Sequence, residues 1–166
     1  FFFIEVNARI QVEHPVSEMI TGVDLIKAQI SVAANEPLSM TQDDVQCSGH
    51  AIECRINAED PNTFVPMPGT ITDYHAPGGL DVRVDSAIYS GYRVPPYYDS
   101  LIAKLVVRGG NRNECIMRLR RALEEYVIGG VPTTLDVHRA LISNADFQNG
   151  SYNIHWLEKF IADRDD

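Results

Sequence analysis

The chain has 166 residues, 45% of them hydrophobic and 22% charged, which is typical of one globular domain with a hydrophobic core. The net charge of -9 argues against nucleic-acid binding, which needs a basic surface, but a few buried arginines could still hold an anionic substrate. The longest apolar runs are too short to span a membrane. Cys47, Cys54 and Cys115 form no zinc-binding pattern, so we expect free thiols and a cytoplasmic protein.

Residues 1–13 alternate strictly between apolar and polar side chains, which predicts a β-strand with two different faces. His14-Pro15 should end this strand, because proline cannot donate a hydrogen bond to a ladder. The opening Phe1-Phe2-Phe3-Ile4 resembles the middle of a strand rather than a native terminus. We therefore expect a chain whose upstream half is missing.

A helix is predicted next, with a capping box at Thr21–Asp24 followed by an apolar stripe. The stripe comprises Leu25, Ile26, Ile30 and Ala33, and Asn35-Glu36-Pro37 stops the helix. The polar stretch 37–49 is typical of a connector. It places a domain boundary between residues 1–45 and residues 46–166.

The remainder predicts an α+β fold, a mostly antiparallel sheet flanked by helices. The period-two segment from His50, in which Ile52, Cys54, Ile56 and Ala58 share a face, predicts one strand. Further strands are predicted over 70–75, 80–85, 89–94 and 101–107, and helices over 111–126, 133–143 and 154–162.

The polar face of the first predicted strand carries Glu5, Asn7, Arg9, Gln11 and Glu13, an unusual set because Asn and Glu are poor strand formers. Such a row could bind a metal, hold an anion and move a proton within one site. The alternative from spacing alone is a solvated face on an edge strand.

Several long motifs, in order, carry a family resemblance. EVNARIQVEH over 5–14 is similar to the signature of biotin carboxylases and carbamoyl-phosphate synthetases, members of the ATP-grasp superfamily. ECRINAEDP over 53–61 and PPYYDSLIAKL over 95–105 narrow the resemblance to biotin carboxylases, and NIH over 153–155 extends it to nearly the whole chain. The implied architecture is the end of an ATP-grasp domain followed by the biotin carboxylase C-terminal domain.

The resemblance implies a role for each residue of the first polar row. Glu5 and Asn7 match residues beside the ATP phosphates that hold Mg²⁺ or Mn²⁺, for which oxygen ligands are suited. Arg9, Gln11 and the backbone of Val12 match the bicarbonate pocket, and Glu13 matches the general base that yields carboxyphosphate. We also expect the cation of Arg9 to favour the carboxylate form of Glu13. The alternatives are a capping or ladder-bonding amide at Asn7 and a structural ion pair of Arg9 with Glu13.

Four residues farther along the chain also match family positions. Arg55 matches the residue that contacts the ureido oxygen of biotin, although Glu53 could merely pair with it. Ile154 matches a position packed against adenine, or it is a core residue of the last helix. Leu80 and Arg83 match a homodimer surface, or they lie at an exposed strand end.

The sequence lacks parts that the family needs. It has no glycine-rich phosphate lid, and none of Lys27, Lys104 and Lys159 lies in a context that would grip ATP phosphates. We therefore expect this chain to be inactive alone. The resemblance implies acetyl-CoA carboxylase of fatty acid synthesis as the parent, with biotin carboxyl carrier protein and carboxyltransferase as partners. Propionyl-CoA or pyruvate carboxylase, a non-catalytic dimerisation or carrier-docking module, and another ATP-grasp ligase remain alternatives.

Overall fold

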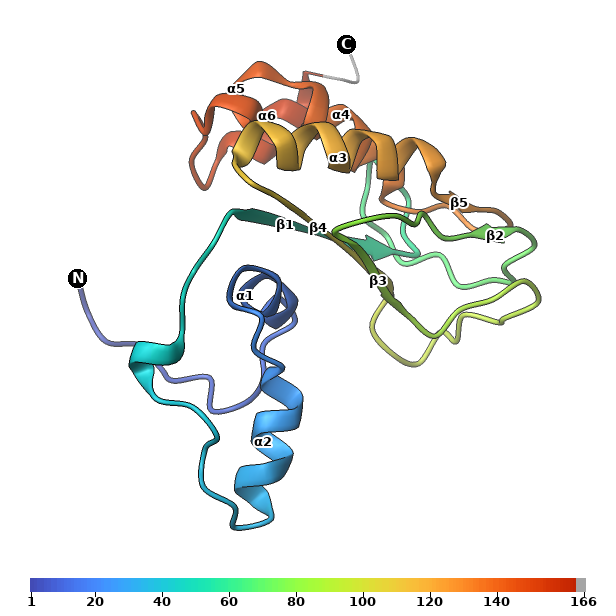
Figure 1. Ribbon diagram of the computed structural model, residues 1–166. Helices are drawn as coiled ribbons and strands as arrows, with labels where there is room; N and C mark the ends of the chain where they lie inside the picture. The colour runs from blue at the N-terminus through green and yellow to red at the C-terminus, as the bar shows by residue number, and fades with distance from the viewer. Residues whose placement is uncertain (164–166) are drawn as a thin grey trace.

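The structure is a computed structural model that describes residues 1–163. It contains a central antiparallel sheet flanked by helices, which confirms the predicted α+β class (Figure 1). The helices are α1 (His14–Thr21), α2 (Leu25–Ala33), the 3-10 helix η1 (Gln42–Asp44), α3 (Arg112–Glu125), α4 (Leu135–Ser143), α5 (Ala145–Asn149) and α6 (Trp156–Ala162). The strands are β1 (His50–Asn57), β2 (Tyr74–His75), β3 (Val82–Ser86), β4 (Leu101–Gly109) and β5 (Val127–Ile128).

The main sheet has the strand order β1-β4-β3, and both pairings are antiparallel. Its apolar face carries Cys54, Ile56 and Leu105, which are buried in the core as the alternation of β1 predicted. Helix α3 packs on this face, whereas α1 contacts β1 and β4 and lies across the sheet from α3 (Figure 1). The sheet therefore has one face in the core and one face under α1.

Helix α3 forms where its capping signal and apolar stripe agree. The side chain of Asn111 accepts a hydrogen bond from the backbone N–H of Glu114, as an N-cap residue does. The inward side chains of Cys115, Leu119 and Leu123 are buried against the sheet. Burial of each large apolar side chain contributes about 1.5–3 kcal/mol, so this stripe determines the orientation of the helix.

The predicted strand over residues 1–13 is wrong. These residues form no strand, and within residues 1–163 no strand lies beside them to complete a hydrogen-bonded ladder. Helix α1 begins at His14, where Pro15 occupies the first turn, in which its missing N–H costs nothing. Gly22 then ends the helix in the left-handed conformation, and Asp24, not Thr21, caps α2 through the N–H of Lys27.

Two further strand predictions are wrong in extent. Over 70–75 the structure has only the two-residue β2, and over 89–94 it has only an isolated bridge between Thr70 and Arg93. The segments still exchange backbone hydrogen bonds, with Ile71 N–H donating to the Tyr92 carbonyl at 2.9 Å. A turn at Gly91 interrupts the pairing, so no regular ladder forms. Short elements β5 and α5 had no clear sequence signal.

The remaining global expectations concern domains, thiols and the membrane. Cys47, Cys54 and Cys115 are free, and burial raises the pKa of Cys54 to about 12. No helix within residues 1–163 has both the length and the apolar character that crossing a bilayer requires. The domain boundary between residues 45 and 46 stays a prediction.

Candidate functional site

The sheet face under α1 carries a row of charged side chains contributed by all three strands. Arg55 on β1 is directly opposite Lys104 on β4, and Lys104 is opposite Asp85 on β3, so the three project from the same face. Glu53 and Arg83 belong to this face because each lies two residues from a member of it. We call these five residues the charged face. Sequence reasoning did not place Lys104 on this face, because residues 101–107 predict a buried strand, and no sequence signal singled out Asp85.

Glu13 meets Arg55 at the edge of the charged face. Its carboxylate Oε2 accepts a hydrogen bond from Arg55 Nη2 at 2.9 Å, although 42 positions separate the two residues in the chain. Both side chains are more than half exposed, so the ion pair contributes at most about 1 kcal/mol to stability. Within the described chain, Arg9 forms no ion pair with Glu13. The cation beside Glu13 is therefore Arg55 and not Arg9, whereas the expected role of Arg9 in the bicarbonate pocket stays a prediction.

Glu53 lies beneath Arg55 and is almost completely buried, with 5% of its side chain exposed. Its Oε1 is 3.9 Å from Arg55 Nε, and its Oε2 has no hydrogen-bond partner in residues 1–163. Burial raises the pKa of Glu53, and the nearby charges of Lys104 and Arg55 oppose this effect. Arg55 thus contacts both acids, and its contact with Glu13 is the shorter one.

Helix α4 and Thr134, the residue that precedes it, hold the backbone of Arg55 in place. The carbonyl oxygen of Arg55 accepts hydrogen bonds from Thr134 Oγ1 at 3.0 Å and from the ring Nε2 of His138 at 2.8 Å. Thr134 also accepts a hydrogen bond from the N–H of Asn57 at 3.0 Å. These bonds give partners to the Arg55 carbonyl and the Asn57 N–H on β1, which is an edge strand of the sheet. They also fix the direction in which Arg55 projects.

His138 makes the stability of this arrangement depend on pH. Burial lowers the pKa of His138 below its ordinary 6.5, and the hydrogen bond to Arg55 opposes the shift. As the pH falls, the unfolded chain therefore binds a proton at His138 before the folded chain does. The contribution of neutral His138 to the free energy of unfolding is complete above about pH 6.5 and declines below it.

The free energy of unfolding should therefore fall between pH 7.5 and pH 5.5. We expect this fall to be smaller in His138→Gln, by up to about 1 kcal/mol, measured by urea denaturation. The exposed His155→Gln should leave this pH dependence unchanged.

The other residues of the first polar row are not gathered at this site. Glu5, Asn7 and Arg9 are exposed in a segment without regular structure. Arg9 Nη1 donates to the carbonyl of Ile10 at 3.4 Å, and Gln11 Nε2 donates to the carbonyl of Arg9 at 3.3 Å. The oxygen atoms of Glu5 and Asn7 suit Mg²⁺ chemically. Residues 1–163 contain no cluster of three or more His, Cys, Asp or Glu side chains that could hold a metal, so these two could supply only part of a ligand set.

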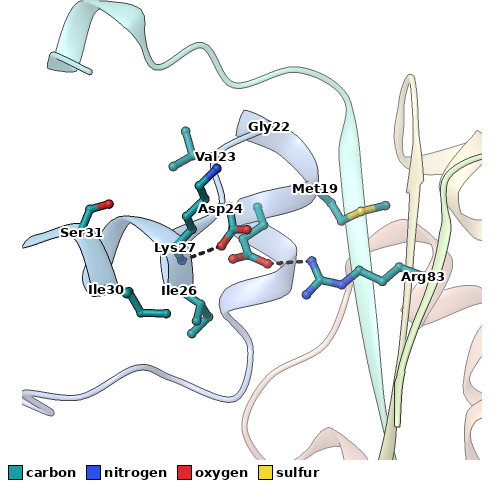
Figure 2. Close-up of a pocket in the computed structure, with 10 residues that line it drawn as sticks. Met19, Gly22, Val23, Asp24, Ile26, Lys27, Ile30, Ser31 and Arg83 are labelled. Carbon is teal, nitrogen blue, oxygen red and sulfur yellow. Dashed lines mark hydrogen bonds and ion pairs between the residues drawn. The ribbon is translucent and has the colours of Figure 1, made fainter. Parts of the chain in front are cut away.

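Ile154 is 88% exposed and precedes α6, so its interpretation as a core residue of the last helix is wrong. Leu80 is exposed before β3 begins. Arg83 points toward α1 (Figure 2), where Glu18 Oε2 accepts a hydrogen bond from its Nη1 at 2.6 Å. Both carboxylate oxygens of Asp85 also accept hydrogen bonds from Arg83, each at 2.8 Å. Glu18, which no sequence signal identified, is thus buried with a partner.

A groove of about 850 Å³ opens beside this ion pair, between α1, α2 and Arg83 (Figure 2). Ile26 and Ile30 of α2 line it and are exposed. Neither Glu13 nor Arg55 lines the groove, so it is distinct from the site at the edge of the charged face.

Comparison with known proteins decides the family. The model of the biotin carboxylase C-terminal domain matches residues 53–159, well over half of the chain. The chain belongs to the biotin carboxylases. A second model, the ATP-binding domain of the carbamoyl-phosphate synthase L chain, matches residues 1–41, in agreement with an ATP-grasp protein.

Individual biotin carboxylases agree with this assignment. The biotin carboxylase of Pseudomonas aeruginosa is 55% identical over 162 residues, which are 98% of this chain and 36% of the relative. A similar solved structure is the biotin carboxylase domain dimer of Hydrogenobacter thermophilus 2-oxoglutarate carboxylase, in complex with MgADP, ADP and bicarbonate. It is 50% identical to this chain with a TM-score of 0.92, and the match covers 95% of this chain and 35% of that one. The structure of the complete pyruvate carboxylase of Rhizobium etli is 38% identical to this chain with a TM-score of 0.90. The match covers 96% of this chain and 16% of that one. The chain thus spans about a third of the length of the curated biotin carboxylases it matches.

Proposed function

We propose that this chain supplies one wall of a biotin carboxylase active site, which carboxylates biotin with MgATP and bicarbonate through carboxyphosphate. The observation that carries this proposal is the contact of 2.9 Å between Glu13 and Arg55. Two residues that match the general base and the biotin-contacting arginine of the family come together from distant parts of the chain. The relative solved with MgADP and bicarbonate supports the same reactants.

The two residues divide the proposed chemistry between proton transfer and charge stabilisation. Glu13 takes the proton of bicarbonate, which then attacks the γ-phosphoryl group of ATP, releasing ADP and forming carboxyphosphate. Carboxyphosphate breaks down to CO2 and phosphate, and phosphate removes the N1 proton of the biotin ureido group. Negative charge develops on the ureido oxygen, where the Arg55 guanidinium stabilises it. The ureido nitrogen then attacks CO2 to give carboxybiotin.

Residues 5–12 and Ile154 would bind the remaining reactants. Arg9, with its guanidinium fork, Gln11 and the backbone of Val12 would hold bicarbonate. Glu5 and Asn7 would provide oxygen ligands for the magnesium of MgATP, and Ile154 would pack against adenine. The exposure of Glu5, Asn7, Arg9 and Ile154 is consistent with surfaces that a larger protein covers.

We place the parent protein in bacterial acetyl-CoA carboxylase and fatty acid synthesis, in the cytoplasm. Its partners are then a biotin carboxyl carrier protein and a carboxyltransferase. Homodimerisation through Leu80 and the neighbourhood of Arg83 is supported by the dimeric relative and by the exposed apolar side chains of Leu80, Ile26 and Ile30. Propionyl-CoA and pyruvate carboxylases remain alternatives, because one of the pyruvate carboxylase subunits of Methanothermobacter thermautotrophicus is 54% identical.

A chimera tests the function directly. The matched 162 residues of the Pseudomonas aeruginosa enzyme are replaced by this chain, and phosphate release from ATP is measured with bicarbonate, magnesium and free biotin. We expect turnover by the chimera, none by this chain alone, and a fall of about 100- to 10,000-fold in Glu13→Gln. A folded chimera without turnover, beside an active parent enzyme, would refute the catalytic proposal and favour a dimerisation or carrier-docking module.

A further inference from the structure

Lys104 occupies the centre of the charged face. It lies on β4, paired with Arg55 of β1 on one side and with Asp85 of β3 on the other. Only 15% of its side chain is exposed, whereas Lys27 and Lys159 are exposed. A lysine this buried needs partners for its ammonium group, because an unpaired buried charge is costly.

The partners of Lys104 connect the sheet to the segment that carries Glu13. Its Nζ donates a hydrogen bond to the carbonyl oxygen of Val12 at 3.3 Å and lies 3.8 Å from Asp85 Oδ2. Asp85 is itself held by two hydrogen bonds from Arg83, each 2.8 Å long. The ammonium group is therefore fixed from the β3 side and reaches toward the residue that precedes Glu13.

Few other contacts restrain that segment. Within residues 1–163, two hydrogen bonds join residues 1–13 to the sheet: one from Arg55 to Glu13, and one from Lys104 to Val12. The first involves the reacting carboxylate itself, which must exchange partners during proton transfer. The second holds the adjacent peptide independently of that exchange.

We propose that Lys104 is a positioning residue, which holds the Val12 peptide so that the Glu13 carboxylate stays beside Arg55. This inference rests on the proposed function, because it assigns Glu13 the role of general base. Lys104 acts through the Val12 peptide, to which its Nζ donates a hydrogen bond, and thereby on the adjacent Glu13. A base must lie within hydrogen-bond reach of its proton, so even a displacement of about 1 Å lowers the rate strongly.

The test compares variants of the chimera by steady-state kinetics and thermal unfolding. Lys104→Met keeps the length of the side chain but removes the donor, and we expect kcat to fall about 10- to 100-fold. The KM for ATP should change less than about twofold, because ATP binding does not depend on this contact. Lys104→Arg, which restores a cationic donor, should recover kcat to within about fivefold of the unsubstituted chimera. Lys27→Met removes an exposed lysine and should leave both constants unchanged.

Two results would overturn the positioning role. One is an unaltered kcat in Lys104→Met. The other is a folded Lys104→Arg variant with kcat as low as that of Lys104→Met, which would mean that the site needs the packing of lysine rather than a donor to Val12. An inactive unsubstituted chimera would instead count against the proposed function, so the two failures are distinguishable.

Discussion

Arg55→Ala in the chimera is expected to lower biotin-dependent turnover about 100- to 1,000-fold, the usual cost of removing a group that stabilises developing charge. The guanidinium lies 2.9 Å from the Glu13 carboxylate and is aimed by a backbone carbonyl that Thr134 and His138 hold. Because Arg55 is half exposed, its loss should change the free energy of unfolding by less than about 1 kcal/mol. The effect should therefore appear in kcat and not in stability.

The measurement is phosphate release with and without free biotin, together with thermal unfolding. Arg55→Lys should remain impaired, because an ammonium group cannot reproduce the planar fork of arginine. ATP cleavage without biotin should fall less than cleavage with biotin, since the ureido charge develops only in the second half of the reaction. Arg120→Ala, which removes an exposed arginine of α3, is the matched control and should retain full activity. Normal biotin-dependent turnover in Arg55→Ala would exclude the proposed role.

Gly130→Ala is expected to destabilise the chain by about 3–5 kcal/mol, near the upper end for single substitutions. The backbone of Gly130 has φ 91°, a left-handed conformation that costs a residue with a Cβ about 1–2 kcal/mol. An added Cβ would also lie 2.2 Å from the carbonyl oxygen of Thr70 and 2.7 Å from the nitrogen of Thr72. Both are backbone atoms, so the loop that contains them would have to move.

Gly150→Ala separates these two causes. Gly150 has a similar left-handed backbone, with φ 73°, but no atom lies within 4 Å of an added Cβ. We expect a loss of only about 1–2 kcal/mol, measured for both variants by equilibrium urea unfolding. Equal losses in the two variants would show that the close approach of Thr70 and Thr72 contributes nothing.

Local signals in the sequence identified the elements that form the core. The alternation over β1, the apolar run of β4 and the capped stripe of α3 were each predicted near their observed positions. They could be predicted because a strand or helix that is buried on one face has apolar residues spaced at the period of that element. The same residues carry the motifs of the C-terminal domain, so the family was also evident from the sequence.

The first 21 residues show where local signals failed. Alternation over residues 1–13 predicted a strand, but a strand needs a hydrogen-bonding neighbour, and the described chain has none there. Pro15 was interpreted as a strand terminator, although proline is equally suited to the first turn of a helix. Helix α1 was missed for that reason, and with it the burial of Glu18 against Arg83.

By itself, the sequence determined the fold class, the core elements and the residue types that suit the proposed chemistry, because these depend on short-range spacing. Only the tertiary structure decided which of those residues meet. It brought Glu13 to Arg55 rather than to Arg9, and it placed Lys104 against Val12. The physical reason is that strand register and the packing of α1 on the sheet set these distances, and both depend on contacts between segments far apart in the chain.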